Sequence, residues 1–168
     1  VVRVLYALFS CDRVSVSTLD TSVSPPALVL KLSQDVRGVR IPLGGLAGAA
    51  VARGSLLNIA DVAADGRFNA DMDRRTGYVT RNMMCCPIKY PPRTGAVIAV
   101  VQVINKLPAG RAFDAHDERL MEAVAVHLGQ TLYKLAPELA LDEDKLPRAI
   151  PCWRLTTPLR LRALTVTN

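Results

Sequence analysis

The stretch that decides the fold is residues 100–124, VVQVINKLPAGRAFDAHDERLMEAV. Its first half is an apolar run that ends in Asn105 and Lys106, and its second half starts with Phe113 and a dense set of charges. Apolar residues then recur at four-residue steps, which is typical of an amphipathic helix. The pattern is a buried strand, a loop and a helix, and the charges at the junction suit an active site, a metal site or a structural clasp.

The helix after this junction has the strongest periodicity in the chain. Asp114 is placed to cap its first turn, and Asp117 and Glu118 put negative charge where the helix dipole favours it. Its apolar face is formed by Leu120, Met121, Val124, Ala125, Leu128 and Leu132. We therefore expect one long helix with a single buried face.

Besides this helix, four segments are predicted to be strands, and the last of them contains the apolar run before Asn105. Residues 13–19 alternate Val and Ser, and residues 27–33 resume an apolar pattern after a Pro-Pro turn, so we expect the two to pair antiparallel. Residues 85–90 and 95–106 are joined through PPRTG, which is typical of a hairpin.

A small-residue segment lies between these two pairs of strands. Gly44 and Gly45 open it, and Gly54 stands where a left-handed helix C-cap favours glycine. We expect a short helix whose bare N-terminus could hold a phosphate through unpaired N–H groups and the helix dipole. A tight turn with close packing explains the same glycines, and both interpretations stay open.

Residues 68–82, FNADMDRRTGYVTRN, are the most function-like polar stretch. Asp73, Thr76 and Thr80 are spaced so that on a helical turn they would point the same way. A carboxylate beside two hydroxyls suits a sugar or a purine edge. An N-cap in a solvated loop explains the same residues equally well.

The histidine and cysteine positions do not favour a metal site or a reactive thiol. His116 and His127 would be roughly 16 Å apart on the predicted helix, too far to share an ion. We expect His116 at the surface and His127 packed on the helix face. Cys85 and Cys86 are neighbours that would face opposite sides of a strand, so we expect buried thiols. We expect no metal, no cofactor and no catalytic group.

Charge and hydropathy narrow the class of protein. The net charge of +6 lies mainly in residues 145–168, which hold five basic and no acidic residues, while the rest is nearly neutral, so no nucleic-acid partner is expected. The longest apolar run, AVIAVVQVI, is far shorter than the roughly 20 residues that span a bilayer. Without Cys-x-x-Cys pairs the chain reads as reduced, and we expect it to be cytoplasmic and free of the membrane.

The length of 168 residues fits one domain. We assign it to residues 1–136 and interpret residues 137–168, with four prolines and no sustained period, as a linker or disordered basic tail. The opening reads as the end of a helix running into a strand, so we expect a fragment whose N-terminal helix is truncated.

Together these segments resemble a GAF domain, of the type found as regulatory modules in cyclic-nucleotide phosphodiesterases and some adenylyl cyclases. The similarity runs from about Val14 to Tyr133 through CDRVSV, the long block from residue 39 to 88, and VVQVINK…F…DE. It implies an α+β fold with a central antiparallel sheet of about six strands and flanking helices. It also implies a pocket roofed by residues 56–82, with residues 61–82 as a lid.

Within this resemblance the junction is similar to the N-K-F-D-E signature of the family, here Asn105, Lys106, Phe113, Asp117 and Glu118. In that family its Lys and Asp form an ion pair away from the ligand, so the resemblance implies a clasp for the fold. A lysine at a strand end and an aspartate in the first turn of the next helix can bridge the loop between them. Such a pair is costly to break on one side only.

The resemblance also implies a set of ligand residues. A serine on the first strand matches a base contact, backbone groups at the glycine-rich helix start match neighbours of a cyclic phosphate, and polar residues of the lid match contacts over the nucleotide. The set is Ser15, Leu46, Ala47, Asn69, Asp73, Thr76, Thr80 and Gln102.

Departures from the family pattern bear on the ligand. Where cGMP-binding members place a Phe-Asp pair, this chain has Ser33 and Gln34, while Gln102 replaces an acidic residue and Asn69 an aromatic one. The missing aromatic platform removes base stacking of about one to three kcal/mol. This argues against high-affinity cGMP binding and leaves cAMP, another small ligand or no ligand open.

The implied function is a regulatory sensor of cAMP or cGMP in a larger signalling protein, such as a phosphodiesterase or an adenylyl cyclase. The alternative is a non-binding module that forms a homodimer through its terminal helices. A thiol-dependent methionine-sulfoxide reductase of the same fold does not fit the cysteine arrangement.

Overall fold

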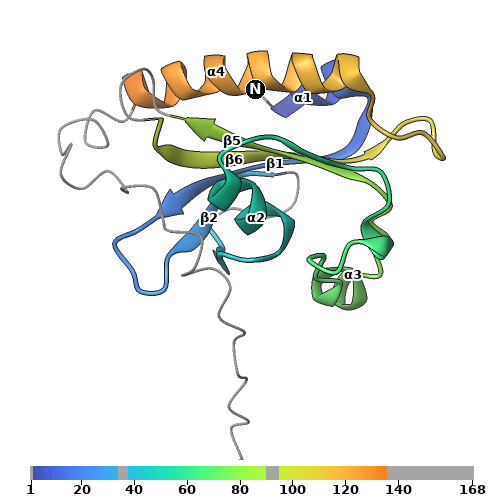
Figure 1. The fold of residues 1–168 in the computed structure, drawn as a ribbon, viewed down its shortest axis with the longest axis horizontal. Coiled ribbons are helices and arrows are strands. Elements are labelled where there is room, and N and C mark those ends of the chain that lie inside the picture. Colours follow the sequence, from blue (N-terminus) through green and yellow to red (C-terminus); the bar gives the residue numbers. More distant parts are fainter. Residues whose placement is uncertain (1, 34–37, 90–94, 136–168) are drawn as a thin grey trace, which may run out of the picture.

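A computed structural model describes residues 2–33, 38–89 and 95–135. They form a six-stranded sheet in the order β3-β2-β1-β6-β5-β4, with every neighbouring pair antiparallel and helices on both faces (Figure 1). The expected α+β fold is confirmed. The strands are β1 Cys11–Asp20, β2 Ala27–Leu32, β3 Arg40–Pro42, β4 Leu57–Ile59, β5 Met83–Lys89 and β6 Val97–Lys106. The helices are α1 Val2–Phe9, α2 Gly45–Arg53, the 3-10 helix η1 Val62–Ala64, α3 Asp71–Thr76 and α4 Ala115–Leu135.

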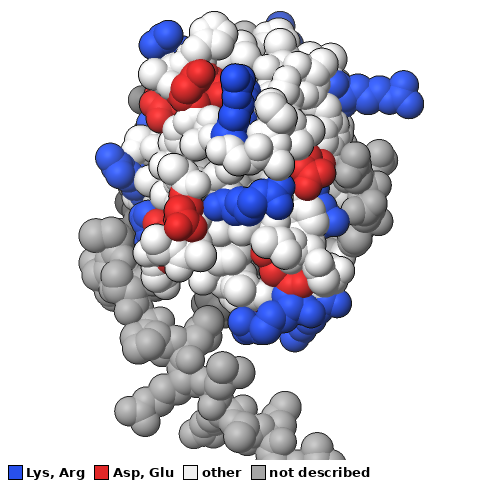
Figure 2. All heavy atoms as spheres, turned by 90° about the vertical axis from the view of Figure 1, so that its right-hand side faces the viewer, with Lys and Arg blue, Asp and Glu red and all other residues white. Residues whose placement is uncertain are grey.

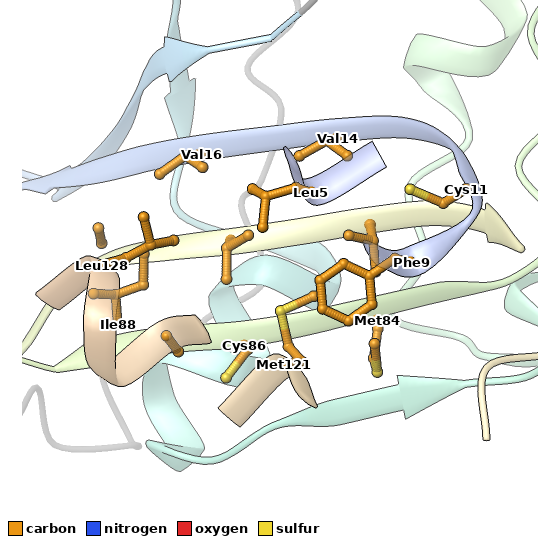
Figure 3. Packing of buried hydrophobic residues seen from close by; sticks show 14 of the residues in the cluster. Leu5, Phe9, Cys11, Val14, Val16, Met84, Cys86, Ile88, Met121 and Leu128 are labelled. Carbon is orange, nitrogen blue, oxygen red and sulfur yellow. The ribbon is translucent and has the colours of Figure 1, made fainter. Parts of the chain in front are cut away.

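The sheet separates two hydrophobic cores. α1 and α4 both cover one face, and Phe9 of α1 and Met121 of α4 are fully buried in the core between the helices and the strands (Figures 1 and 3). On the other face Leu46 and Ala50 of α2 pack with Val62 of η1. Because successive strand residues point to opposite faces, each core receives one of two neighbouring cysteines. Cys86 belongs to the α4 core and Cys85 to the α2 core, as predicted.

The helix ends are mostly those expected from the sequence. Gly54 closes α2 with a left-handed φ of 64°, and Gly44 precedes α2 without a side-chain cap. Asp114 caps α4, because its Oδ1 accepts from the backbone N–H groups of His116 at 2.8 Å and Asp117 at 3.0 Å. One expectation is wrong: His127 is exposed on α4 and does not pack against the sheet.

Two strands were not predicted individually, and some predictions lie outside the described residues. β3 and β4 have three residues each, too few for a period of two to stand out. β5 begins two residues before the predicted strand. Most of the PPRTG connection, Gln34 and residues 137–168 lie outside the described residues.

The surface beside α3 carries both signs of charge. Figure 2 shows Lys and Arg interspersed with Asp and Glu over this face, without a continuous basic field. This face therefore lacks the one-sided charge of a nucleic-acid-binding surface. No helix within the described ranges is long and apolar enough to cross a membrane. The same residues contain no group of three or more His, Cys, Asp or Glu side chains that could hold a metal ion.

Gly129 allows α4 to approach β5 closely, because a Cβ there would collide with the carbonyl oxygen of Lys89. We expect Gly129→Ala to lower the free energy of unfolding by about 1–2 kcal/mol, since overpacking against the backbone outweighs the gain in helix propensity. Urea denaturation measures the change. Gly66→Ala is the matched control, because no heavy atom lies within 4 Å of a Cβ at Gly66. Equal stability of Gly129→Ala and the wild type would contradict the close approach.

Candidate functional site

Polar residues form a row across the α2 face of the sheet. Ser15 on β1 lies opposite Gln102 on β6, and Gln102 lies opposite Cys85 on β5. The Ser15 hydroxyl donates to Gln102 Oε1 at 3.2 Å. The Gln102 amide nitrogen contacts the sulfur atoms of Met83 at 3.4 Å and Cys85 at 3.5 Å. Because sulfur is a weak acceptor, this amide keeps donor capacity for a ligand.

The start of α2 lies on the same face as this row. Leu46 is buried in the α2 core and Ala47 packs against it, so these two residues have only backbone groups to offer a ligand. Gly48 N–H donates to the Gly44 carbonyl at 2.9 Å and begins the helical ladder. The N–H groups before it have no intrahelical partner, as in every α-helix. They are the groups that the sequence resemblance assigned to a phosphate.

The first half of the lid is held by short-range polar contacts. Asp65 binds the Arg67 guanidinium through both carboxylate oxygens, at 2.9 and 2.6 Å. The Arg67 side-chain hydrogen bonds lower the pKa of Asp65 to about 2. Asn69 is exposed, and its Oδ1 accepts from the Asp71 N–H at 2.8 Å. Asn69 therefore supports the start of α3 and uses its carbonyl oxygen there.

Asp73 and Thr80 meet in the second half of the lid. Asp73 accepts from the Thr80 N–H at 2.7 Å and from the Thr80 hydroxyl at 2.9 Å, one bond to each carboxylate oxygen. The expected helical turn through Asp73, Thr76 and Thr80 is wrong, because α3 ends at Thr76. Gly77, with φ 68°, turns the chain back and brings Thr80 to Asp73. Thr76 stays exposed at the helix end. A ligand that accepts from the Thr80 N–H or hydroxyl must compete with Asp73, whereas the Asp73 carboxylate keeps lone pairs for a ligand donor.

Lys106 and Asp117 form the ion pair expected at the junction. Lys106 Nζ lies 2.8 Å from Asp117 Oδ1, and the side chains are 15% and 5% exposed. The same Nζ donates to the carbonyl oxygen of Phe9, at the end of α1, at 2.9 Å. It also lies 5.6 Å from the ring centroid of Phe113. The clasp therefore joins β6 and α4, as the family resemblance implied, and also α1.

The other signature residues bind two further segments. Asn105 is 1% exposed and has a left-handed φ of 56°, a conformation that Asn tolerates better than most residues. Its side chain accepts from the Arg81 N–H at 2.7 Å and donates to the Val79 carbonyl at 2.8 Å. Asn58 of β4 donates to Glu118 Oε1 at 2.8 Å and to the Phe113 carbonyl at 3.0 Å.

Sequence reasoning missed Arg13 and Tyr78. The Arg13 guanidinium carbon lies 3.7 Å from the centroid of the Tyr78 ring. Arg13 precedes Ser15 by two positions on β1, so alternation alone would have placed it on the ligand face. No periodicity could have found Tyr78, because it lies in the irregular segment between α3 and β5.

The three described cysteines are buried and unpaired with one another. Burial raises the pKa of Cys11 to about 11 and the pKa of Cys85 and of Cys86 to about 12. Protonated thiols are poor nucleophiles, so these positions do not resemble a reactive thiol site.

A cavity of about 440 Å³ lies between β5 and α4, on the face of the sheet opposite the predicted ligand residues. Leu56, Cys86 and Ala125 contribute apolar surface to it, and Lys89 and Glu122 contribute charges. Its lining residues come from the segment after α2, from β5 and its following segment, and from α4. None of the residues assigned to the ligand from the sequence lines this cavity.

Comparison with known families and proteins places these features in context. The model of the GAF domain family matches residues 1–132. A probable 3',5'-cyclic phosphodiesterase of Caenorhabditis elegans is 40% identical over 103 residues, which are 60% of this chain and 14% of that protein. A dual 3',5'-cyclic-AMP and -GMP phosphodiesterase 11 of Drosophila melanogaster is 39% identical over 102 residues, 60% of this chain and 7% of that protein. The chain thus corresponds to a small part of these relatives.

Solved structures with low sequence identity share the fold. The GAF domain of a phosphoenolpyruvate-protein phosphotransferase from Coxiella burnetii matches with a TM-score of 0.68 and 19% identity, over 83% of this chain and 82% of that one. The free methionine-R-sulfoxide reductase of Neisseria meningitidis matches with a TM-score of 0.60 and 24% identity, over 77% and 71% of the two chains. Such likeness shows the fold alone.

Removal of one partner from the Lys106–Asp117 pair should be costly. We expect Asp117→Ala to lower the free energy of unfolding by about 3 kcal/mol, because it leaves a mostly buried ammonium without its counter-charge. The double variant Lys106→Met with Asp117→Ala should lose less than the sum of the single changes. The exposed pair Arg74–Asp71 is the control, and Asp71→Ala should change stability by less than about 0.5 kcal/mol. Additive losses in denaturation curves at the buried pair would contradict the clasp.

The thiols should be unreactive in the folded chain. At pH 8 we expect iodoacetamide to alkylate Cys11, Cys85 and Cys86 only as fast as the chain unfolds, because burial and raised pKa values suppress the thiolate. Peptide mass spectrometry with and without urea measures each position. Stability should fall as the pH rises above 9.0, the ordinary thiol pKa, because the thiols of the unfolded chain ionise first. Rapid alkylation of Cys85 or Cys86 without urea would contradict the buried assignment.

Proposed function

Because this chain belongs to the GAF domain family, we propose that it is a regulatory domain that binds a cyclic nucleotide, cAMP or cGMP, within a larger signalling protein. The observation that carries the proposal is the Ser15–Gln102 row beside the start of α2. Relatives whose names describe cyclic-nucleotide phosphodiesterases support this class of ligand.

Each part of a cyclic nucleotide has a chemical counterpart in the proposed site. The first-turn N–H groups of α2 suit the cyclic phosphate, because a helix N-terminus attracts anions. Ser15 and Gln102 suit the edge of the base, since a hydroxyl and an amide both donate and accept. The lid residues Asp73, Thr76, Thr80 and Asn69 are proposed to cover the sugar and the base.

The amide of Gln102 favours adenine as the base. A carboxylate at this position would only accept hydrogen bonds, as the donor-rich edge of guanine requires. An amide offers one donor and one acceptor, which is the arrangement that pairs with adenine in nucleic-acid recognition. We therefore expect cAMP to bind more tightly than cGMP.

The proposal extends to the domain and its setting. Residues 1–136 form the sensor of a cytoplasmic signalling protein, such as a phosphodiesterase, and residues 137–168 are a linker or a disordered basic tail. The domain itself contributes regulation and no catalytic group. A ligand that binds one conformation of residues 61–82 better than the other would shift the domain towards that conformation, and the attached parts of the protein would respond to the shift.

Exposed apolar side chains on the terminal helices favour a second role in dimerisation. Val4 and Leu8 of α1 are 57% and 42% exposed, and Val126 of α4 is 60% exposed. α1 and α4 lie on one face of the sheet (Figure 1), so a second copy could cover both. Sedimentation velocity with and without cAMP separates the two roles. A dimer that neither binds nor responds to nucleotide favours the non-binding module.

Calorimetric titration tests the sensor. We expect saturable binding of cAMP, weaker binding of cGMP, and a loss of about tenfold in cAMP affinity in Gln102→Ala, because one hydrogen-bonding group contributes about 1.4 kcal/mol. Gln102→Glu should shift the preference towards cGMP. Gln130→Ala, at an exposed position of α4, is the matched control. Absence of saturable binding of either nucleotide below about 1 mM would sink the proposal.

A further inference from the structure

Tyr78 lies at the C-terminal end of the lid, where the lid meets two central strands. Its hydroxyl donates to Asp12 Oδ2 on β1 at 2.7 Å and accepts from Asn105 Nδ2 on β6 at 2.8 Å. The face of its ring lies against the Arg13 guanidinium at 3.7 Å. One side chain therefore contacts both β1 and β6 at the sheet end nearest the lid.

The strand side of this contact is firmly held. Asn105 is 1% exposed, and its own N–H donates to the Asn82 carbonyl at 2.9 Å. Its side chain is bound to Val79 and Arg81 as well as to Tyr78. A fully satisfied buried amide has one favourable orientation, so Asn105 presents a fixed donor to the phenol.

The protonation state of Tyr78 suits the contact. An ionised Asp12 accepts only, so the phenol must keep its proton to donate. Burial, with the hydrogen bond to Asp12, raises the pKa of Tyr78 well above the ordinary 10.0. The phenol is thus protonated throughout the physiological range of pH.

The anchor lies close to the residues proposed to cover the nucleotide. Thr80, two positions after Tyr78, donates to Asp73 through its backbone N–H and its hydroxyl. Arg13, which stacks on Tyr78, is two positions before Ser15 on the same strand. A displacement of Tyr78 would therefore move the Asp73–Thr80 pair relative to the strand that carries Ser15.

We propose that Tyr78 is a positioning residue of the nucleotide site, whose anchorage to Asp12, Arg13 and Asn105 sets the closed position of the lid, residues 61–82. This inference rests on the proposed function. Loss of the anchor increases the fraction of open lid, and the apparent affinity falls in proportion to the closed fraction. The bound nucleotide then dissociates faster.

Hydrogen exchange in the ligand-free chain tests the anchor directly. In Tyr78→Phe the ring remains on Arg13 and the hydroxyl is lost, so we expect the amides of residues 73–82 to exchange about five- to tenfold faster. Asp12→Ala should give a smaller change in the same amides, because the hydroxyl keeps its bond from Asn105, and the double variant should give no more than Tyr78→Phe alone. Asp12→Asn keeps an acceptor oxygen and should retain most of the protection. Val79→Ala is the matched control, because the Val79 side chain is 63% exposed.

Nucleotide kinetics in the same variants give the second measurement. We expect the dissociation rate of cAMP to rise about five- to tenfold in Tyr78→Phe, with little change in the association rate. Unchanged lid exchange in both Tyr78→Phe and Asp12→Ala overturns the anchor. Faster exchange across the whole sheet, with a lower Tm, overturns a positioning role in favour of general stability. A wild-type chain that binds no cyclic nucleotide overturns the proposed function instead, and lid exchange distinguishes that failure from the loss of the anchor.

Discussion

The ion pair between Lys106 and Asp117 holds the ends of three elements at one point. Asp117 lies in the first turn of α4, and Lys106 ends β6 and also binds the carbonyl of Phe9 at the end of α1. Both side chains are mostly buried, so each charge depends on the other to offset the water that it has lost. The two helices that cover one face of the sheet are therefore fixed to the central strand β6. Their apolar side chains pack with those of the strands in one core (Figure 3).

The residue before Lys106 binds the opposite layer of the molecule. Asn105 holds residues 78–82, which lead from the lid into β5, while Lys106 holds the helices. Consecutive residues of one strand thus contact the lid on one face and α1 and α4 on the other. A change in the lid has a short physical connection to the helices, through a strand end that is almost completely buried. This connection suits the proposed function, in which a ligand regulates attached parts of a protein.

The proposed ligand residues differ in how freely they can bind. Thr80 already uses its N–H and its hydroxyl on Asp73, and Asn69 uses its carbonyl oxygen at the start of α3, so a ligand that needs these groups must displace existing hydrogen bonds. Gln102 keeps an amide group whose partners are sulfur atoms. Specificity is therefore expected to come mainly from the sheet, and closure mainly from the lid. Tyr78 belongs to the second group, since its contacts are with strands.

Local patterns in the sequence determined the long elements and their ends. The period of α4, its cap Asp114, the left-handed Gly54 and the opposite faces of Cys85 and Cys86 are properties of neighbouring residues, so they could be predicted. The resemblance to a family supplied the sheet of six strands, because strands of three residues leave no period to detect. Only the tertiary structure decided which distant groups meet: Tyr78 reaches Asp12 across 66 positions and Asn58 reaches Glu118 across 60. Spacing within one segment carries no information about such partners, because they are brought together by the packing of the whole sheet.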